Sequence, residues 1–204
     1  MVIKKNVYIL WLIIIVMNIA IFASGSGTNA ENIINYFANN KFVNISLILS
    51  NKKEAYVLER AKNHSLASFI FNKNQFYNST EVLDLLKKKK IDFIVLAGFM
   101  WLVPENLIKN YPSKIINIHP ALLPKYGGKG MYGNNVHKAV VENKERESGI
   151  TIHFVNEHYD DGTIIFQAKC EVEEFDTFED VANKIHLLEY EHFPKIIEHV
   201  IKGR

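Results

Sequence analysis

From Met17 onward, short apolar runs rich in β-branched residues alternate with amphipathic helical patterns, and this alternation constrains the fold most strongly. Strands are expected over 19–23, 43–50, 67–71, 92–97, 114–118, 149–155 and 163–172. Helices are expected over 29–39, 54–62, 136–143 and 178–201, and Pro194 could bend the last of these. A further helix is expected to run from a cap at Asn78 or Ser79 to Lys90, and a short one is expected to begin at Pro104. Alternating strands and helices imply right-handed crossovers. The sequence therefore predicts a three-layer, Rossmann-like α/β fold with a mainly parallel central sheet and helices on both faces.

The N-terminal segment departs from that pattern. Residues 7–23 are almost all apolar and follow Lys4 and Lys5, which is typical of a signal peptide or a membrane anchor. Spanning a bilayer takes about 20 apolar residues, and such a span would consume 19–22, which the domain needs as its first strand. We therefore expect residues 1–16 to be a start-site artefact or a short extension, with a real anchor as the alternative. Residues 17–204 are expected to form a single domain.

Net charge and cysteine content indicate which ligands the protein can bind and in which cell compartment it is expected. A net charge of +2 gives no sign of broad nucleic-acid binding, so an anionic ligand must be held by local features. The single cysteine, Cys170, excludes an internal disulfide and favours a reducing compartment, for which the cytoplasm is the expected location.

The segment 117–124 places polar chemistry at the end of a predicted strand. Asn117 and His119 are two residues apart, so their side chains lie on the same side of the strand. Pro120 and Pro124 then force the chain out of the sheet into a loop. A hydrogen-bond donor beside a proton-transferring group, at the edge where open α/β sheets bind ligands, indicates chemistry on a carbonyl.

A glycine-rich loop, Ser24–Asn29, joins the first strand to the first helix. Glycines allow a tight turn whose N–H groups, together with the helix N-terminus, can hold an anion. The loop lacks the third glycine of a dinucleotide fingerprint, because Ala30 stands in that place, and it is not followed by the Gly-Lys-Ser/Thr of a Walker loop. It favours a single phosphate monoester, with a plain strand–helix turn as the alternative.

A second polar group follows, with His153 on a predicted strand and Asp160-Asp161-Gly162 in the turn after it. A carboxylate brought beside His119 would favour the charged imidazole and orient the ring. An amine that attacks a carbonyl carbon creates an oxyanion and a cationic nitrogen. One group must then stabilise the oxygen, and another must move a proton from the attacking nitrogen towards the leaving group.

The Asn-Ile-His-Pro-Ala-Leu-Leu-Pro of 117–124 resembles the Asn-Ile-His-Pro-Ser-Leu-Leu-Pro motif of the folate-dependent formyltransferases, with Ala121 in place of serine. The resemblance extends from Met17 to about Phe193. It implies the formyltransferase fold and transfer of the formyl group of 10-formyltetrahydrofolate, a co-substrate, to the amine of glycinamide ribonucleotide in purine biosynthesis. Both partners are small molecules, and neither nucleic acid nor a membrane is expected. The sequence leaves the choice between monomer and homodimer open.

The resemblance also implies a role for individual residues. The catalytic positions are Asn117, His119 and the aspartate of the later turn, which aligns with Asp160 and leaves Asp161 as the second choice. His153 is expected to support Asp160 through a hydrogen bond. Glu189 matches a carboxylate that binds the ribose hydroxyls. The substrate phosphate is expected at Gly25, Ser26, Gly27, Thr28 and Asn29. The folate is expected at Met100, Trp101, Leu102, Val103, Asn117 and Asp160.

Three alternatives share part of this pattern. Methionyl-tRNA formyltransferase carries an additional C-terminal domain, whereas this sequence ends at Arg204, and the near-neutral charge argues against tRNA. Formyltetrahydrofolate hydrolase has an N-terminal regulatory domain for which 1–16 are too short. A membrane-tethered nucleotide-binding module would not need Asn117, His119 and Asp160 together. The histidines show no ligand spacing of the His-Glu-x-x-His kind, so no metal is expected.

Overall fold

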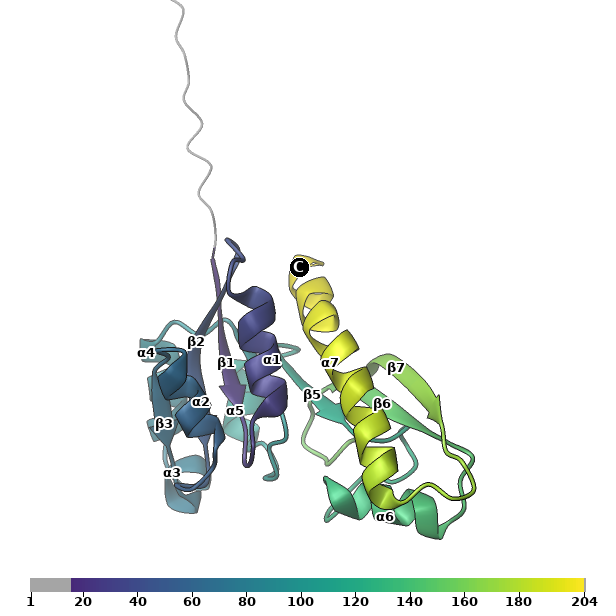
Figure 1. Cartoon of the computed structure of the whole chain (residues 1–204). Coiled ribbons are helices and arrows are strands. Elements are labelled where there is room, and N and C mark those ends of the chain that lie inside the picture. The colour runs from purple at the N-terminus through teal and green to yellow at the C-terminus, as the bar shows by residue number, and fades with distance from the viewer. Residues whose placement is uncertain (1–15, 204) are drawn as a thin grey trace, which may run out of the picture.

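The computed structural model describes residues 16–203, in which seven strands form one sheet of order β3-β2-β1-β4-β5-β6-β7 (Figure 1). The strands are β1 (Met17–Phe22), β2 (Val43–Ser50), β3 (Ser68–Ile70), β4 (Phe93–Leu96), β5 (Ile115–His119), β6 (Glu147–Phe154) and β7 (Ile164–Glu171). The helices are α1 (Thr28–Phe37), α2 (Val57–Asn63), α3 (Lys73–Tyr77), α4 (Glu81–Lys88), α5 (Glu105–Asn110), α6 (Asn134–Glu142) and α7 (Phe178–Lys202). The first five strands pair in parallel with one another, and β6 pairs antiparallel with both β5 and β7. This confirms the prediction of a mainly parallel sheet.

Two apolar cores cover the two faces of the sheet. In β1, Ile19 and Ile21 point into the core shared with α1, α2, α6 and α7, whereas Ala20 and Phe22 point into the core shared with α3, α4 and α5. This is the alternation that a strand buried on both faces requires. The three-layer prediction is therefore confirmed.

The helices differ most from the predictions in two places, and elsewhere their bounds shift by three residues or fewer. Residues 73–77, for which no helix was expected, form α3 behind a reciprocal cap in which Asn72 and Gln75 exchange side-chain and backbone hydrogen bonds. The helix expected from Glu54 begins instead at Val57. The closing helix α7 runs as one element through Pro194.

The connections after β1 and β4 meet where the strand order reverses, since β1 has β2 on one side and β4 on the other. The Ser24 N–H donates to the Gly98 carbonyl at 3.0 Å, and the Met100 N–H donates to the Ser24 hydroxyl at 3.0 Å. These bonds fix the two loops to each other. Open α/β sheets bind their ligands at such a switch point.

The expected extension 1–16 lies outside the described residues, apart from the exposed Val16. Among residues 16–203, no helix is long and apolar enough to cross a bilayer.

Candidate active site

A cavity of about 530 Å³ opens at the carboxyl ends of β1, β4 and β5. Four stretches of the chain supply most of its wall, and residues from β6, the turn after it that carries Asp160, α6 and α7 complete it. The stretches are 25–29, 96–103, 117–120 and 128–133. All of the residues that the sequence assigns to the site line this cavity, although they come from loops and strands far apart in the chain.

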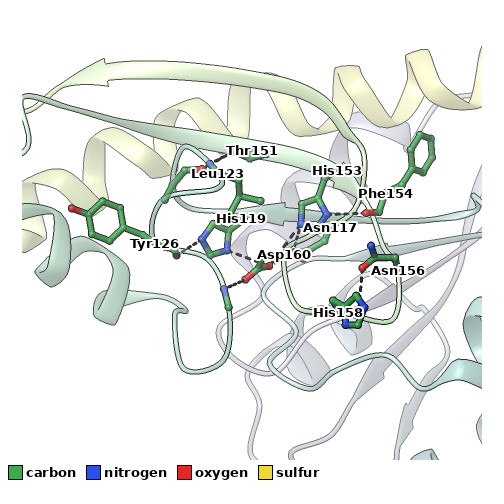
Figure 2. A network of polar contacts seen from close by, with 12 residues as sticks. Asn117, His119, Leu123, Tyr126, Thr151, His153, Phe154, Asn156, His158 and Asp160 are labelled. Carbon is green, nitrogen blue, oxygen red and sulfur yellow. Dashed lines mark hydrogen bonds and ion pairs between the residues drawn. The ribbon is translucent and has the colours of Figure 1, made fainter.

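The centre of the cavity is built on the pairing of β5 with β6 (Figure 2). In this antiparallel pair, Asn117 lies opposite His153, and His119 lies opposite Thr151. Asn117 and His119 both line the cavity, as their two-residue spacing predicts. Thr151 is fully buried, and its hydroxyl donates to the Ala121 carbonyl at 2.7 Å, which fixes the turn that follows His119.

His119 is held between a backbone carbonyl and a carboxylate. Its Nε2 lies 2.7 Å from the Tyr126 carbonyl oxygen, which can only accept, so Nε2 carries a hydrogen. Its Nδ1 faces Oδ1 of Asp160 at 3.5 Å, as Figure 2 shows. The ring is 3% exposed and is thereby fixed in orientation.

Asp160, and not Asp161, faces the catalytic pair. Asp160 adopts a left-handed backbone with φ of 53°, and its Oδ2 accepts from the Gly128 N–H at 2.9 Å. Its other oxygen, Oδ1, is turned towards Asn117 and His119. Asp161 is exposed and accepts from the Asn156 amide at 3.3 Å.

His153 contacts Asn117, which corrects the expected hydrogen bond to Asp160. Nδ1 of His153 donates to the Phe154 carbonyl at 2.8 Å, and burial lowers the pKa of His153, so its Nε2 is free to accept. Nε2 accepts from the Asn117 amide at 3.1 Å but lies 3.8 Å from Asp160 Oδ1. His153 therefore orients the side-chain amide of Asn117. The carboxylate of Asp160 is oriented instead by the Gly128 N–H.

Two side-chain nitrogens converge on one side of the centre, and that of His119 is a donor there when the ring is protonated. Asn117 Nδ2 and His119 Nδ1 each lie 3.5 Å from Asp160 Oδ1. Charge-assisted hydrogen bonds are typically about 2.7–2.9 Å, so both contacts are long. A substrate oxygen entering the cavity can take closer hydrogen bonds from the same two donors. The arrangement suits an oxygen that becomes negatively charged during reaction.

One end of the cavity is formed by the loop 25–29 and by α7. Gly27 is the N-cap of α1 in a left-handed conformation, and α1 begins at Thr28. The Asn29 amide donates to Glu189 Oε2 at 2.8 Å, which ties the loop to the last helix. Backbone N–H groups at the start of α1 and the positive end of its dipole suit an anion there.

Two histidines missed as site residues flank Glu189, which is 5% exposed. Nδ1 of His186 lies 3.0 Å from Glu189 Oε2, and this hydrogen bond raises the pKa of His186. Burial, followed by the nearby His186, lowers the pKa of His137 to about 4, so His137 is neutral at pH 7. His186 could have been found from sequence, because a residue three positions before Glu189 lies on the same face of a helix.

Another part of the cavity wall is apolar and aromatic. Met100, Trp101, Leu102 and Val103 line it, as the sequence predicts. Ring centroids of Phe71, Phe76 and Tyr77 each lie 5.9 Å from that of Trp101. This part suits a planar, largely apolar group. Within residues 16–203, no group of three or more histidine, cysteine or acidic side chains is arranged to hold a metal ion.

We expect Gly27→Ala to destabilise the fold by about 1–3 kcal/mol. Gly27 has φ of 73°, and an added Cβ would lie 2.5 Å from Val57 Cβ, so both the backbone and the α1–α2 packing would resist the change. The free energy of unfolding in urea measures the effect. Gly25→Ala is the matched control, because its Cβ would meet nothing within 4 Å. Equal stability of the two variants would contradict the prediction.

Comparison with known proteins gives a consistent result. The family described as formyl transferase matches residues 17–197. A chloroplastic phosphoribosylglycinamide formyltransferase of Arabidopsis thaliana is 40% identical over 197 residues, covering 91% of this chain and 67% of the relative. The phosphoribosylglycinamide formyltransferase of Haemophilus influenzae is 36% identical, covering 91% and 88%. The crystal structure of the Bacillus halodurans phosphoribosylglycinamide formyltransferase superposes with a TM-score of 0.81 at 37% identity, covering 90% and 95%.

Proposed function

Because this chain belongs to the formyl transferase family, we propose that it transfers the formyl group of 10-formyltetrahydrofolate to the amine of N1-(5-phosphoribosyl)glycinamide in purine biosynthesis. One observation carries the proposal. Asn117, His119 and Asp160 meet in a cavity whose wall also includes a glycine-rich loop suited to an anion and an aromatic surface. These two parts of the wall match a phosphorylated amine and a pterin carrier.

The reaction begins with attack of the glycinamide nitrogen on the formyl carbon. A carbon–nitrogen bond forms, and the carbonyl oxygen becomes an oxyanion. Asn117 Nδ2 and the protonated His119, paired with Asp160, donate hydrogen bonds to that oxygen. Protonated His119 then gives a proton to N10 of the folate, the bond between N10 and the formyl carbon breaks, and the attacking nitrogen returns a proton to His119. The products are the N-formyl amide and tetrahydrofolate.

These parts of the wall position the two substrates. The phosphate binds at the backbone of 25–29, where α1 begins. Oε2 of Glu189 already accepts from Asn29 and His186, which leaves Oε1 to accept from the ribose hydroxyls. The pterin lies against residues 100–103. All of these groups belong to one chain, so a single copy is sufficient for the reaction.

A cytoplasmic location rests on the single cysteine, which favours a reducing compartment. The Arabidopsis relative is a chloroplast protein, so the compartment differs among the relatives. Fractionation of the source cells, with the chain detected in the soluble fraction, supports this location. Recovery with membranes contradicts it.

The activity is tested with the purified chain, 10-formyltetrahydrofolate and glycinamide ribonucleotide. Formation of the formylated ribonucleotide in step with tetrahydrofolate is expected, and no folate is consumed when the amine is left out. Loss of formyl folate without the amine would instead indicate a hydrolase. Absence of any turnover with both substrates would refute the proposal.

A further inference from the structure

The helix α2 lies behind the loop 25–29 and holds two successive backbone carbonyls of this loop. The Val57 N–H donates to the Gly25 carbonyl at 3.2 Å, and Nε of Arg60 donates to the Ser26 carbonyl at 2.8 Å. No residue of α2 lines the cavity, whereas all five residues of the loop do. The two carbonyls therefore point to the side of the loop that faces away from the cavity.

Fixing a carbonyl also fixes the N–H group of the same peptide bond. Both peptide bonds are trans and planar, so that C=O and N–H point in opposite directions. The Ser26 and Gly27 N–H groups therefore point away from α2, towards the cavity. Neither donates to a backbone acceptor among residues 16–203. Successive N–H groups that the backbone does not use can form a concavity that binds an anion.

Arg60 also balances an acidic side chain next to the loop. Glu31 lies in the first turn of α1, where its carboxylate would repel an anion bound at the helix N-terminus. Nη1 of Arg60 pairs with Oε2 of Glu31, and Cζ of Arg60 lies 5.0 Å from the ring centroid of Tyr56. The Arg60 side chain is only 18% exposed. A planar guanidinium fixed in this way contacts the loop and the carboxylate at once.

We propose that Arg60 is a positioning residue for the phosphate of the ribonucleotide. Arg60 lies outside the cavity and does not touch the phosphate, but it aims the Gly27 N–H at it and offsets the charge of Glu31. The inference rests on the proposed function, in which the loop 25–29 binds that phosphate. An arginine that only joined α1 to α2 would affect stability and not the preference for a phosphorylated substrate.

Arg60→Ala is expected to raise the dissociation constant and the KM for glycinamide ribonucleotide about tenfold, the lower end of what a hydrogen bond to a charged group contributes. The kcat at saturating ribonucleotide and the KM for formyl folate should change little, because the catalytic side chains and the aromatic part of the wall are unaltered. Arg60→Lys keeps the charge but not the planar fork, so its KM is expected to lie between those of the alanine variant and the unmodified chain.

The test compares the ribonucleotide with glycinamide ribonucleoside, which lacks the phosphate, in the unmodified chain, Arg60→Ala, Arg60→Lys and Lys62→Ala. Lys62 is an exposed cation on the same helix and serves as the matched control. The advantage of the phosphorylated substrate in kcat/KM is expected to fall about tenfold in Arg60→Ala, to fall less in Arg60→Lys, and to stay unchanged in Lys62→Ala.

An unchanged advantage in both Arg60 variants, or an equal loss with the two substrates, would overturn the inference while formyl transfer itself stands. Arg60→Lys retains a cation beside Glu31 and carries the same comparison if Arg60→Ala does not fold. Absence of formyl transfer in the unmodified chain would refute the proposed function instead.

Discussion

Replacing His119 by alanine is expected to lower kcat for formyl transfer by about 10²–10⁴-fold, the usual contribution of a positioned acid–base group. The variant loses both the donor that faces the reacting oxygen and the proton relay. Binding of glycinamide ribonucleotide should change little, because we propose that the loop 25–29 and Glu189, and not His119, hold its phosphate and ribose. Steady-state kinetics give kcat, and calorimetric titration with the ribonucleotide gives the dissociation constant.

His199→Ala is the control for that experiment. His199 is an exposed histidine in the last turn of α7, far along the helix from Glu189, and its removal should leave kcat unchanged. Full activity in the His119 variant would refute the proposed mechanism. Loss of ribonucleotide binding together with kcat would show that His119 maintains the cavity as a whole.

Replacing Asp160 by asparagine is expected to produce a loss of similar size, about 10²–10⁴-fold in kcat. The amide oxygen of the new residue can still accept from the Gly128 N–H, so the turn keeps its shape. Its NH₂ group then faces His119 Nδ1, which must become an acceptor, and the ring loses the charge that stabilises the oxyanion. Thermal unfolding should show little change in Tm, which separates a chemical defect from a folding defect.

Asp161→Asn offers a matched control one residue away. Asp161 is exposed and contacts Asn156, so its variant should retain nearly full activity. The opposite outcome, with Asp161→Asn inactive and Asp160→Asn active, would exchange the roles of the two carboxylates.

Sequence reasoning predicted the central strands of the sheet well because they are buried on both faces. The run Phe93–Leu96 is apolar at every position and has no helical period, so it indicates a strand without any tertiary information. The helix α3 was missed because its local signals are weak. It is only five residues long, and its capping pair, Asn72 and Gln75, is also common in loops.

The site was predicted in its residues but only partly in its contacts. The two-residue spacing of Asn117 and His119 was enough to place them together. The partner of His153 depends on the register of β6 against β5, which places it opposite Asn117, and no local pattern encodes that register. The contacts of Tyr126 and Gly128 with the catalytic groups use backbone atoms, so no side-chain pattern indicates them.

The hydrogen bond between Asn29 and Glu189 joins residues 160 positions apart. During synthesis, the first strand, the loop and all three catalytic side chains leave the ribosome before α7 does. A chain arrested before residue 189 would therefore carry its reactive groups without the carboxylate to which we assign the ribose. On that assignment, recognition of the ribonucleotide is among the last properties that the nascent protein acquires.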